Sequence, residues 1–545
     1  MNTKPNEPFD IVLANGRVID PETYLDAQMY VGIKGDTIAA VSETPLEGKE
    51  VIDASGLIVS PGFIDMHSHG CNIPSNRLAA FDGVTTSLEL EYGSLPIGKF
   101  YDYCAKEGRP LNYGASVAWG AARVLAWHPD LAVTADTSCY DLWFFATSMK
   151  YGDWVKNVAD KEQLAQILAQ VEAGLKEGGL GIGITHGYAP GAGTKELTAL
   201  CQLAAEYDVP TYTHIQNFSV LDPTSSIDSY VKLIGLAATT GAHMHICHIN
   251  STSSRDIDKA VVLVQKAIDQ GLPITLGAYT WGVAESAIGA AEWNPKDVRD
   301  RLGVEWSDFK LVRTGHDFST REELEKAIKD NPGDLVAVHY LHDETDTHDR
   351  ALLDLSVLFP GGVIETDSVP YTTPEGAFLT SKEWPLPEGS SSHPRAAGTY
   401  TRFLRKWVRE RGVISFMEAI RKSSLRPAQI LEKSTPMMKK KGRIQVGMDA
   451  DIIVFDPETV ADRATFENPR QTAAGMKHVL VNGTVLIRDE PLDQDLGLAG
   501  LETVPHRRGG GGQARSSRGG GCDHSGAGWP EICQPGRAEI RGRTG

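Results

Sequence analysis

The chain has 545 residues, of which 41% are hydrophobic and 23% charged, a globular composition in a length that exceeds one ordinary domain. The net charge is −18, and the part expected to fold carries no basic stripe, which argues against nucleic acid as a partner. The seven cysteines are scattered and show no Cys-x-x-Cys spacing, which argues against a disulfide framework.

The N-terminus lacks the apolar core of a secretory signal, and no segment offers about 18 uncharged apolar residues. We therefore expect a cytoplasmic protein without a membrane segment.

Short strand patterns occupy both ends of the part expected to fold. Residues 9–60 contain several apolar runs separated by turn residues, and Asn15-Gly16 and Lys34-Gly35-Asp36 fit hairpin turns. Similar runs return in residues 442–456 and 478–485. These patterns predict small β structure at each end.

Between these regions, strand patterns alternate with helical periodicity, which predicts βα repeats and a parallel sheet. In one repeat, Asp160 and Gln163 form a capping pattern, an apolar stripe follows, and Gly178-Gly179 ends the helix. Eight strands are expected, the number in a closed barrel, near residues 62–67, 84–91, 112–119, 180–185, 210–215, 243–249, 273–279 and 362–367. A ninth apolar run, 335–341, falls in a region of 300–360 that we interpret as an insertion.

After about residue 495 the composition changes to Gly, Arg and Ser. Too few apolar residues remain to offset the entropy of ordering, so residues 496–545 are expected to be disordered. An RNA-binding basic arm is the less favoured interpretation of this tail, and a non-native extension is the favoured one.

Chemistry-bearing side chains stand where the expected strands end. Side chains two residues apart on a strand point to the same side, so His67 and His69 after the first strand should lie together. The C-terminal ends of barrel strands meet at one face of the barrel. Four imidazoles and a carboxylate there suit one or two Zn²⁺ ions. The expected ligands are His67, His69, His214, His248 and Asp367, with His186 as a weaker candidate and His243 and His245 as structural residues.

Two carboxylates, Glu89 and Glu91, lie on the second expected strand. Buried carboxylates are costly unless they are paired or bind a metal. Glu91 is the preferred bridging ligand because it lies nearer the C-terminal end of the strand, and Glu89 is the alternate. Pairing of both with basic residues inside the barrel remains an alternative.

The run Pro61-Gly62-Phe63-Ile64-Asp65, followed by His67 and His69, resembles the first-strand signature of the amidohydrolase superfamily. Further stretches, at 83–86, 187–191, 212–215 and 393–400, resemble the N-acyl-D-amino-acid deacylases, the D-aminoacylase family. In that family the second strand commonly carries a bridging cysteine, where this sequence has Tyr92. The Leu88–Glu91 run is instead similar to the D-glutamate deacylase-like subgroup.

The resemblance implies an α/β fold, a distorted (β/α)8 TIM barrel inserted in a small β-sandwich formed by both terminal regions. The barrel would span residues 61–439, and the sandwich would combine 1–60 with 440–495. The implied enzyme is a zinc-dependent amidohydrolase that releases a D-amino acid and a carboxylate from an N-acyl-D-amino acid, with N-acyl-D-glutamate as one candidate.

The implied mechanism uses a metal-bound hydroxide as nucleophile and Asp367 as general base and acid. Tyr279 matches the family tyrosine that binds substrate and stabilises the developing oxyanion. Arg395 can form the two-pronged pair that an α-carboxylate requires. Asn250 stands where relatives commonly have a lysine, so the cations that could bind an acidic side chain are Arg255, Lys259 and Arg77.

Two alternatives stay open. One is a cyclic-amide hydrolase of the hydantoinase, dihydroorotase or isoaspartyl dipeptidase type, which usually carries a lysine on the fourth strand; residues 180–185 contain none. The other is a catalytically silent scaffold with this fold. The expected partner is a small N-acyl amino acid, with no nucleic acid and no membrane, and a homo-oligomer is left open.

Overall fold

The computed structural model describes residues 8–131, 151–290 and 293–488. Eight parallel strands form one sheet in the order β17-β12-β11-β10-β9-β8-β7-β6. All eight expected strands are present, in the expected places. Their bounds are β6 Phe63–Asp65, β7 Val84–Ser94, β8 Asn112–Ala118, β9 Ile182–Thr185, β10 Thr211–His214, β11 Met244–Ile246, β12 Ile274–Ala278 and β17 Val363–Ile364.

The first and last of these strands meet at their C-terminal ends. The N–H of Asp367 donates to the carbonyl of His67 at 2.8 Å, and the N–H of His69 donates to the carbonyl of Ser368 at 2.8 Å. Asp65, the last residue of β6, accepts hydrogen bonds from the N–H and the hydroxyl of Thr366 at 3.1 and 2.6 Å. These bonds join the two sheet edges, and the predicted (β/α)8 TIM-barrel fold is confirmed.

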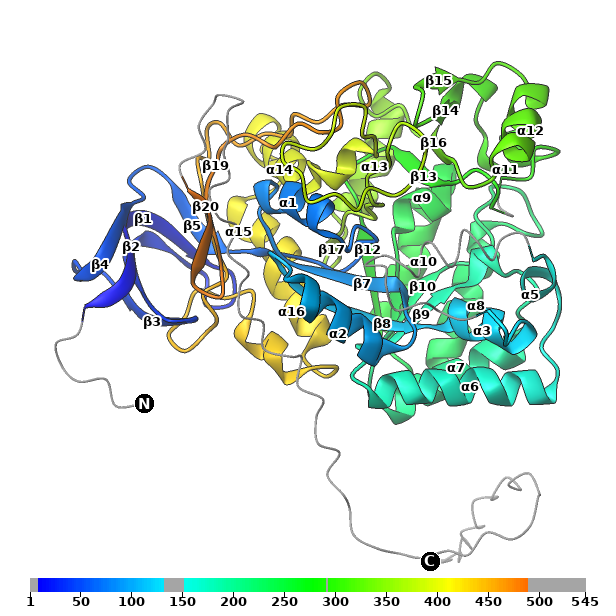
Figure 1. Ribbon diagram of the computed structural model, residues 1–545, viewed down its shortest axis with the longest axis horizontal. Helices are drawn as coiled ribbons and strands as arrows, with labels where there is room; N and C mark the ends of the chain where they lie inside the picture. Colours follow the sequence, from blue (N-terminus) through cyan, green and yellow to red (C-terminus); the bar gives the residue numbers. More distant parts are fainter. Residues whose placement is uncertain (1–7, 132–150, 291–292, 489–545) are drawn as a thin grey trace, which may run out of the picture. The chain divides into compact units, whose positions relative to one another are not determined.

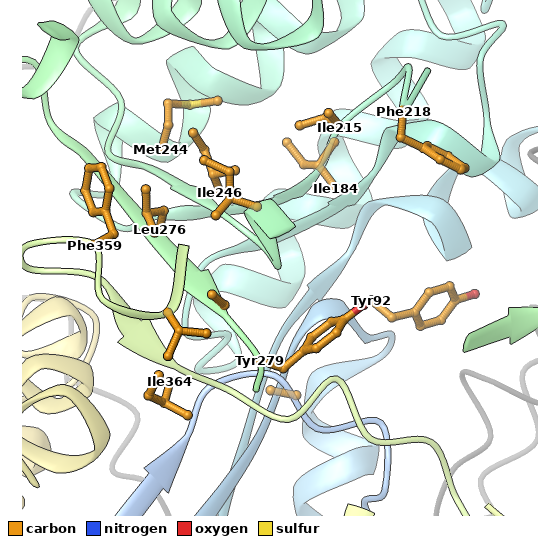
Figure 2. Close-up of a cluster of buried hydrophobic side chains, with 14 of the residues drawn as sticks. Tyr92, Ile184, Ile215, Phe218, Met244, Ile246, Leu276, Tyr279, Phe359 and Ile364 are labelled. Atoms are coloured by element: carbon orange, nitrogen blue, oxygen red, sulfur yellow. The ribbon is translucent and has the colours of Figure 1, made fainter. Parts of the chain in front are cut away.

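Helices connect the barrel strands and surround them (Figure 1). The connecting helices are α1 Ile73–Phe81, α2 Ile97–Glu107, α3 Trp119–Trp127, α5 Asp153–Lys156, α6 Lys161–Lys176, α7 Thr194–Glu206, α8 Ser226–Thr240, α9 Ile249–Ser253, α10 Ile257–Asp269 and α13 Thr347–Val357. Met244, Ile246 and Leu276 lie together on neighbouring strands (Figure 2), in a buried cluster that includes Leu200 of α7 and Val264 of α10. The predicted capping box at Asp160 begins α6.

A second cluster fills the barrel. Ile64, Leu88, Tyr212 and Val363 come from four of its strands, and they pack with Leu431 of α16 (Arg426–Leu431). The helices that precede α16 are α14 Thr399–Phe403 and α15 Phe416–Ile420. The interior of the barrel is therefore a packed core.

Strands from both terminal regions share one sheet, in the order β20-β19-β18-β5-β1-β2-β3, with β4 paired to β1. Their bounds are β1 Phe9–Asp20, β2 Leu25–Lys34, β3 Thr37–Ser42, β4 Gly48–Asp53, β5 Ile58–Pro61, β18 Ile452–Phe455, β19 Met476–Val481 and β20 Thr484–Arg488. Val18 and Val31 pack with Ile452 and Leu480 in one core. The division into residues 1–60 plus 440–495 and 61–439 stays a prediction, and the 496–545 tail lies outside the described residues.

One of the two expected hairpin turns is wrong. Ala14 and Asn15 form a bulge inside β1, because β2 pairs with both sides of it, from Leu13 opposite Val31 to Gly16 opposite Met29. Asn15 takes a φ of 62° at this bulge. The turn at residues 34–36 joins the antiparallel strands β2 and β3, as expected.

The apolar run 335–341 forms β16 (Leu335–His339), which lies outside the barrel. It belongs to a separate antiparallel sheet, in the order β13-β16-β14-β15, that is inserted between β12 and β17 (Figure 1). The other inserted elements are β13 Val283–Ala287, β14 Phe309–Leu311, β15 His316–Asp317, α11 Val298–Leu302 and α12 Arg321–Asp330.

Among the described residues, no helix combines the length and the apolar character that crossing a membrane demands. The cytoplasmic location stays a prediction.

Candidate metal centre and pocket

The structure brings the six expected metal ligands together at the C-terminal ends of the barrel strands. Two follow β6, one lies in β7, one ends β10, one follows β11 and one follows β17. All six are buried: His67, His69, Glu91, His214, His248 and Asp367.

Glu91 lies between the two pairs of histidines. Its Oε2 is 3.3 Å from His67 Nε2 and 3.4 Å from His69 Nε2. Its Oε1 is 3.0 Å from His214 Nδ1 and 2.9 Å from His248 Nε2. One carboxylate thus presents an oxygen to each pair, which is the arrangement that a bridging ligand needs.

Glu89 lies on the other side of the His69 ring. Its two carboxylate oxygens are 3.0 and 2.9 Å from His69 Nδ1, while Nε2 of the same ring faces Glu91. Glu89 also accepts hydrogen bonds from the N–H groups of Tyr92 and Gly93 at 3.3 and 3.4 Å. This position suits a residue that fixes the orientation of His69.

Asp367 contacts both the histidines and a cation. Its Oδ1 is 3.3 Å from His67 Nε2 and 3.4 Å from His69 Nε2, and its Oδ2 is 3.0 Å from Arg395 Nη2. Burial alone would raise the pKa of Asp367, but the charges of Arg395 and His67 outweigh burial and lower it to about 2. Asp367 is therefore ionised at neutral pH.

Glu365, which was not among the expected site residues, is a fully buried carboxylate behind these histidines. Its Oε1 accepts a hydrogen bond from the N–H of His248 at 2.6 Å and lies 3.5 Å from His67 Nδ1. Its Oε2 is 3.5 Å from His245 Nε2. Burial opposes ionisation, but the hydrogen bonds from His245 and His67 lower the pKa of Glu365 below its usual value. The available signal was its place two residues before Asp367.

Two residues of this site adopt an unusual backbone conformation. His248 has a φ of 30° and Asp367 a φ of 51°, in the left-handed region that residues other than glycine rarely enter. Such conformations concentrate at functional sites, where surrounding contacts hold them in place. The bonds from the two backbone N–H groups, to Glu365 and to the carbonyl of His67, supply those contacts here.

The donor set fits a bound metal. The Nε2 atoms of His67 and His69 lie 3.2 Å apart, while each Nδ1 faces a carboxylate, Glu365 or Glu89. With the ring protons on the Nδ1 atoms, the two Nε2 lone pairs and the oxygens of Glu91 face one another and repel. A divalent cation bound between them would remove this repulsion. Ligand atoms lie within 4.8 Å of one another in two groups, His67-His69-Asp367 and His67-Glu91-His248.

The two residues expected to bind substrate lie beside this cluster. Tyr279 follows β12 and is fully buried, and its hydroxyl forms no hydrogen bond of normal geometry within the described ranges. The guanidinium carbon of Arg395 lies 4.8 Å from the centre of the Tyr279 ring. Arg395 is also fully buried, and its contact with Asp367 places it at the cluster although it lines neither adjoining pocket.

Two pockets reach the cluster, with empty volumes of about 500 and 610 Å³. His214 and His248 line the first, together with Phe218, Trp293 and Tyr340. The second borders His69 and has an apolar wall made by Tyr92, Leu335, Val369 and Phe378. Glu91, Asp367 and Glu285 line both.

The cations suggested for an acidic substrate side chain are engaged elsewhere, so that expectation is wrong. Arg255 pairs with Asp349 at 2.9 Å, Lys259 pairs with Asp256, and Arg77 donates to the carbonyl of Lys382. Within the described part of the chain, neither pocket has a lysine or arginine among its lining residues.

The weaker ligand candidate, His186, is not part of the cluster. Its Nε2 lies 3.0 Å from the carbonyl oxygen of Ala192, and burial lowers its pKa to about 4.

Comparison with known proteins identifies relatives along most of the chain. D-aminoacylase from Alcaligenes xylosoxydans xylosoxydans is 25% identical, over 90% of this chain and 97% of that protein. N-acyl-D-glutamate deacylase from the same organism is 26% identical, over 89% of this chain and 95% of that protein.

Solved structures share the fold. N-acyl-D-glutamate deacylase from Bordetella bronchiseptica, complexed with zinc and a phosphonate inhibitor, matches with a TM-score of 0.68 at 20% identity, covering 90% of this chain and 98% of that one. A D-aminoacylase with a binuclear metal center matches with a TM-score of 0.67 at 21% identity, covering 89% and 98%.

These relatives confirm the resemblance to D-aminoacylases that was inferred from the sequence motifs. The model of the Amidohydrolase family matches residues 50–280 and 385–487, so this chain belongs to the amidohydrolase family.

Proposed function

We propose that this protein is a zinc-dependent N-acyl-D-amino-acid deacylase, which hydrolyses a linear amide to a D-amino acid and a carboxylate. The observation that carries the proposal is the position of Glu91 between the pair His67 and His69 and the pair His214 and His248. The similarity to D-aminoacylase along most of the chain supports it.

In this proposal His67, His69, His214, His248 and Asp367 would hold one or two Zn²⁺ ions, and Glu91, which faces both pairs of histidines, would be the bridging ligand. Imidazole nitrogen and carboxylate oxygen are ligands that Zn²⁺ accepts. When bound, the metal lowers the pKa of a water molecule towards neutrality and polarises the amide carbonyl. Glu89 and Glu365 orient His69 and His67 through their Nδ1 atoms.

The protein's own groups then move the protons and hold the substrate. Asp367 is ionised at neutral pH, so a carboxylate oxygen can accept the proton of the attacking water and later transfer it to the leaving amine. The Tyr279 hydroxyl donates a hydrogen bond to the developing oxyanion. The guanidinium of Arg395 lies 3.0 Å from Asp367, and its N–H groups form no hydrogen bond of normal geometry within the described ranges. We assign this guanidinium to the substrate α-carboxylate.

The alternative of cyclic-amide hydrolysis is less well supported. Strand β9 (Ile182–Thr185) contains no lysine that could bridge two metals in the manner usual for that class. D-aminoacylase, N-acyl-D-glutamate deacylase and N-acyl-D-aspartate deacylase are among the relatives that extend over most of the chain. The catalytically silent scaffold is disfavoured because all six expected ligands converge.

The test is amine release from paired N-acetyl-D- and N-acetyl-L-amino acids by the purified protein, with metal analysis of the same sample. We expect hydrolysis of the D-enantiomers, at least tenfold slower hydrolysis of the L-enantiomers, and one or two Zn²⁺ per chain. Asp367→Asn is the inactive control. Equal rates on both enantiomers, or full activity of Asp367→Asn, would contradict the proposal.

A further inference from the structure

The two pockets share a buried carboxylate that the mechanism does not use. Glu285 is the third residue of β13, in the inserted sheet, and pairs with Ala337 of β16. Glu285 is only 6% exposed to solvent. It lines both pockets together with Glu91 and Asp367. The inserted sheet thus places an acidic group opposite the metal cluster.

Glu285 has no ion-pair partner within the described ranges. The backbone of His393 faces its carboxylate and favours ionisation, but neither oxygen accepts a hydrogen bond of normal geometry in those ranges. The positive charge that acts on Glu285 is that of Arg395, whose Nη2 is already paired with Asp367 at 3.0 Å. Burial raises the pKa of Glu285 to about 7, against the opposing effect of Arg395. An acidic group in this state is costly for folding, and such groups concentrate where a ligand binds.

Among the described residues, the rest of the pocket wall carries no lysine or arginine that could pair with an acidic substrate side chain. Asn250 uses its amide group within the protein: it donates to the carbonyl of Tyr279 at 3.0 Å and to the hydroxyl of Tyr340 at 2.9 Å. A γ-carboxylate in either pocket would therefore face Glu285 with no lysine or arginine among the described lining residues to balance the two negative charges.

We propose that Glu285 binds a cationic nitrogen of the substrate, so that the preferred substrate is an N-acyl-D-amino acid that carries an ammonium or guanidinium group. The cation belongs either to the D-side chain or to an α-amino group on the acyl part, since Glu285 borders both pockets. This inference rests on the proposed deacylase function and replaces N-acyl-D-glutamate as its substrate candidate.

The experiment uses substrate pairs that differ in charge at nearly equal size. N-acetyl-D-lysine against N-acetyl-D-norleucine tests the side chain, and glycyl-D-alanine against N-acetyl-D-alanine tests the acyl group. N-acetyl-D-glutamate is the acidic comparison. For the wild-type protein we expect kcat/KM to favour the cationic member of at least one pair by about tenfold or more, and N-acetyl-D-glutamate to be the poorest substrate.

Glu285→Gln should lower that cationic-to-neutral ratio about tenfold, because the charge is removed at almost constant volume. Glu322→Gln, at an exposed position on α12 of the same insertion, makes the same charge change away from the pockets and should leave the ratio at the wild-type value. Glu285→Asp keeps the charge and should retain a larger ratio than Glu285→Gln.

Three results would overturn the inference: a wild-type preference for the neutral member of both pairs, a preference for N-acetyl-D-glutamate, or an equal loss on cationic and neutral substrates in Glu285→Gln. The wild-type panel decides even if the variants fail to fold. Hydrolysis of N-acetyl-D-norleucine and N-acetyl-D-alanine tests the deacylase function separately, because those substrates carry no cation. If neither these nor the charged substrates are hydrolysed, both proposals fail.

Discussion

The metal cluster and the pocket wall differ in whether their buried carboxylates have charged partners. In the cluster, Glu91, Asp367 and Glu365 each lie within 3.5 Å of histidine nitrogens. In the wall, the carboxylate of Glu285 has no ion partner within the described ranges. The cluster stands on barrel strand ends, whereas Glu285 stands on β13 of an insertion that lies between the two stretches matched by the family model. Under the two proposals above, the cluster supplies the groups for the reaction and the wall supplies the group that selects the substrate.

The largest expected effect comes from the cluster. Asp367→Asn should lower kcat on every substrate by about 10³-fold, because the amide can no longer accept the proton from the attacking water. The measurement is steady-state kinetics on N-acetyl-D-alanine. Asp330→Asn, near the exposed end of α12, is the matched control and should keep wild-type kcat. More than a tenth of wild-type kcat in Asp367→Asn would break the assignment.

The next largest effect should be a difference between variants of the two β7 glutamates, Glu91 and Glu89. Glu91→Gln should lose bound metal and activity together, because Glu91 faces all four histidines. Glu89→Gln should keep the metal-to-chain ratio at saturating zinc but weaken affinity about 10–100-fold, because it only orients His69. Competition with a chelator measures both. The reverse pattern would make Glu89 the bridging ligand.

A smaller effect is expected when the pH is changed, and it should arise from Glu285 in the pocket wall alone. Above its pKa of about 7 Glu285 is anionic, and below it the carboxyl is neutral. The kcat/KM ratio of N-acetyl-D-lysine to N-acetyl-D-norleucine should therefore rise several-fold from pH 6 to pH 8. The lysine ammonium stays charged throughout, with a pKa near about 10.4.

The ratio cancels titrations of the metal cluster that affect both substrates. The charged groups that act on Glu285 are Arg395, which favours its ionisation, and Asp367, which opposes it; Asp367, with a pKa of about 2, stays charged over this range. A pH-independent ratio, or the same rise in Glu285→Gln, would remove Glu285 as the cause.

The smallest effect should arise far from both regions. Asp160 accepts a hydrogen bond from the N–H of Gln163 at 2.8 Å and caps α6. Asp160→Ala should lower stability by about 1 kcal/mol, seen as a lower Tm, without changing kcat or the cationic-to-neutral ratio. Asp160→Asn keeps a capping oxygen and should retain most of the stability. A change in the substrate ratio of either variant would mean that the two regions are coupled through the helix layer.

The strand ends could be read from the sequence because the signal is local. His67 and His69 follow an apolar strand directly, and His214, His248 and Asp367 end later runs of the same kind. Strand patterns extend over a few neighbouring residues, and barrel geometry then brings their ends to one face. Asn15-Gly16 shows the limit of a local signal, because such residues suit a turn or a bulge and the pairing with β2 on both sides decided between them.

By itself, the sequence determined the eight-stranded barrel and the six residues that gather at its end. The sequence favoured Glu91 over Glu89 as the bridging ligand only because it lies nearer the strand end. The tertiary structure showed which atoms the two carboxylates face: Glu91 faces both pairs of histidines, whereas Glu89 faces Nδ1 of His69. It also revealed Glu365 behind the cluster and placed Glu285 in the pockets. The β13–β16 pairing that holds Glu285 joins residues about fifty positions apart, and no short pattern in the chain records such a contact.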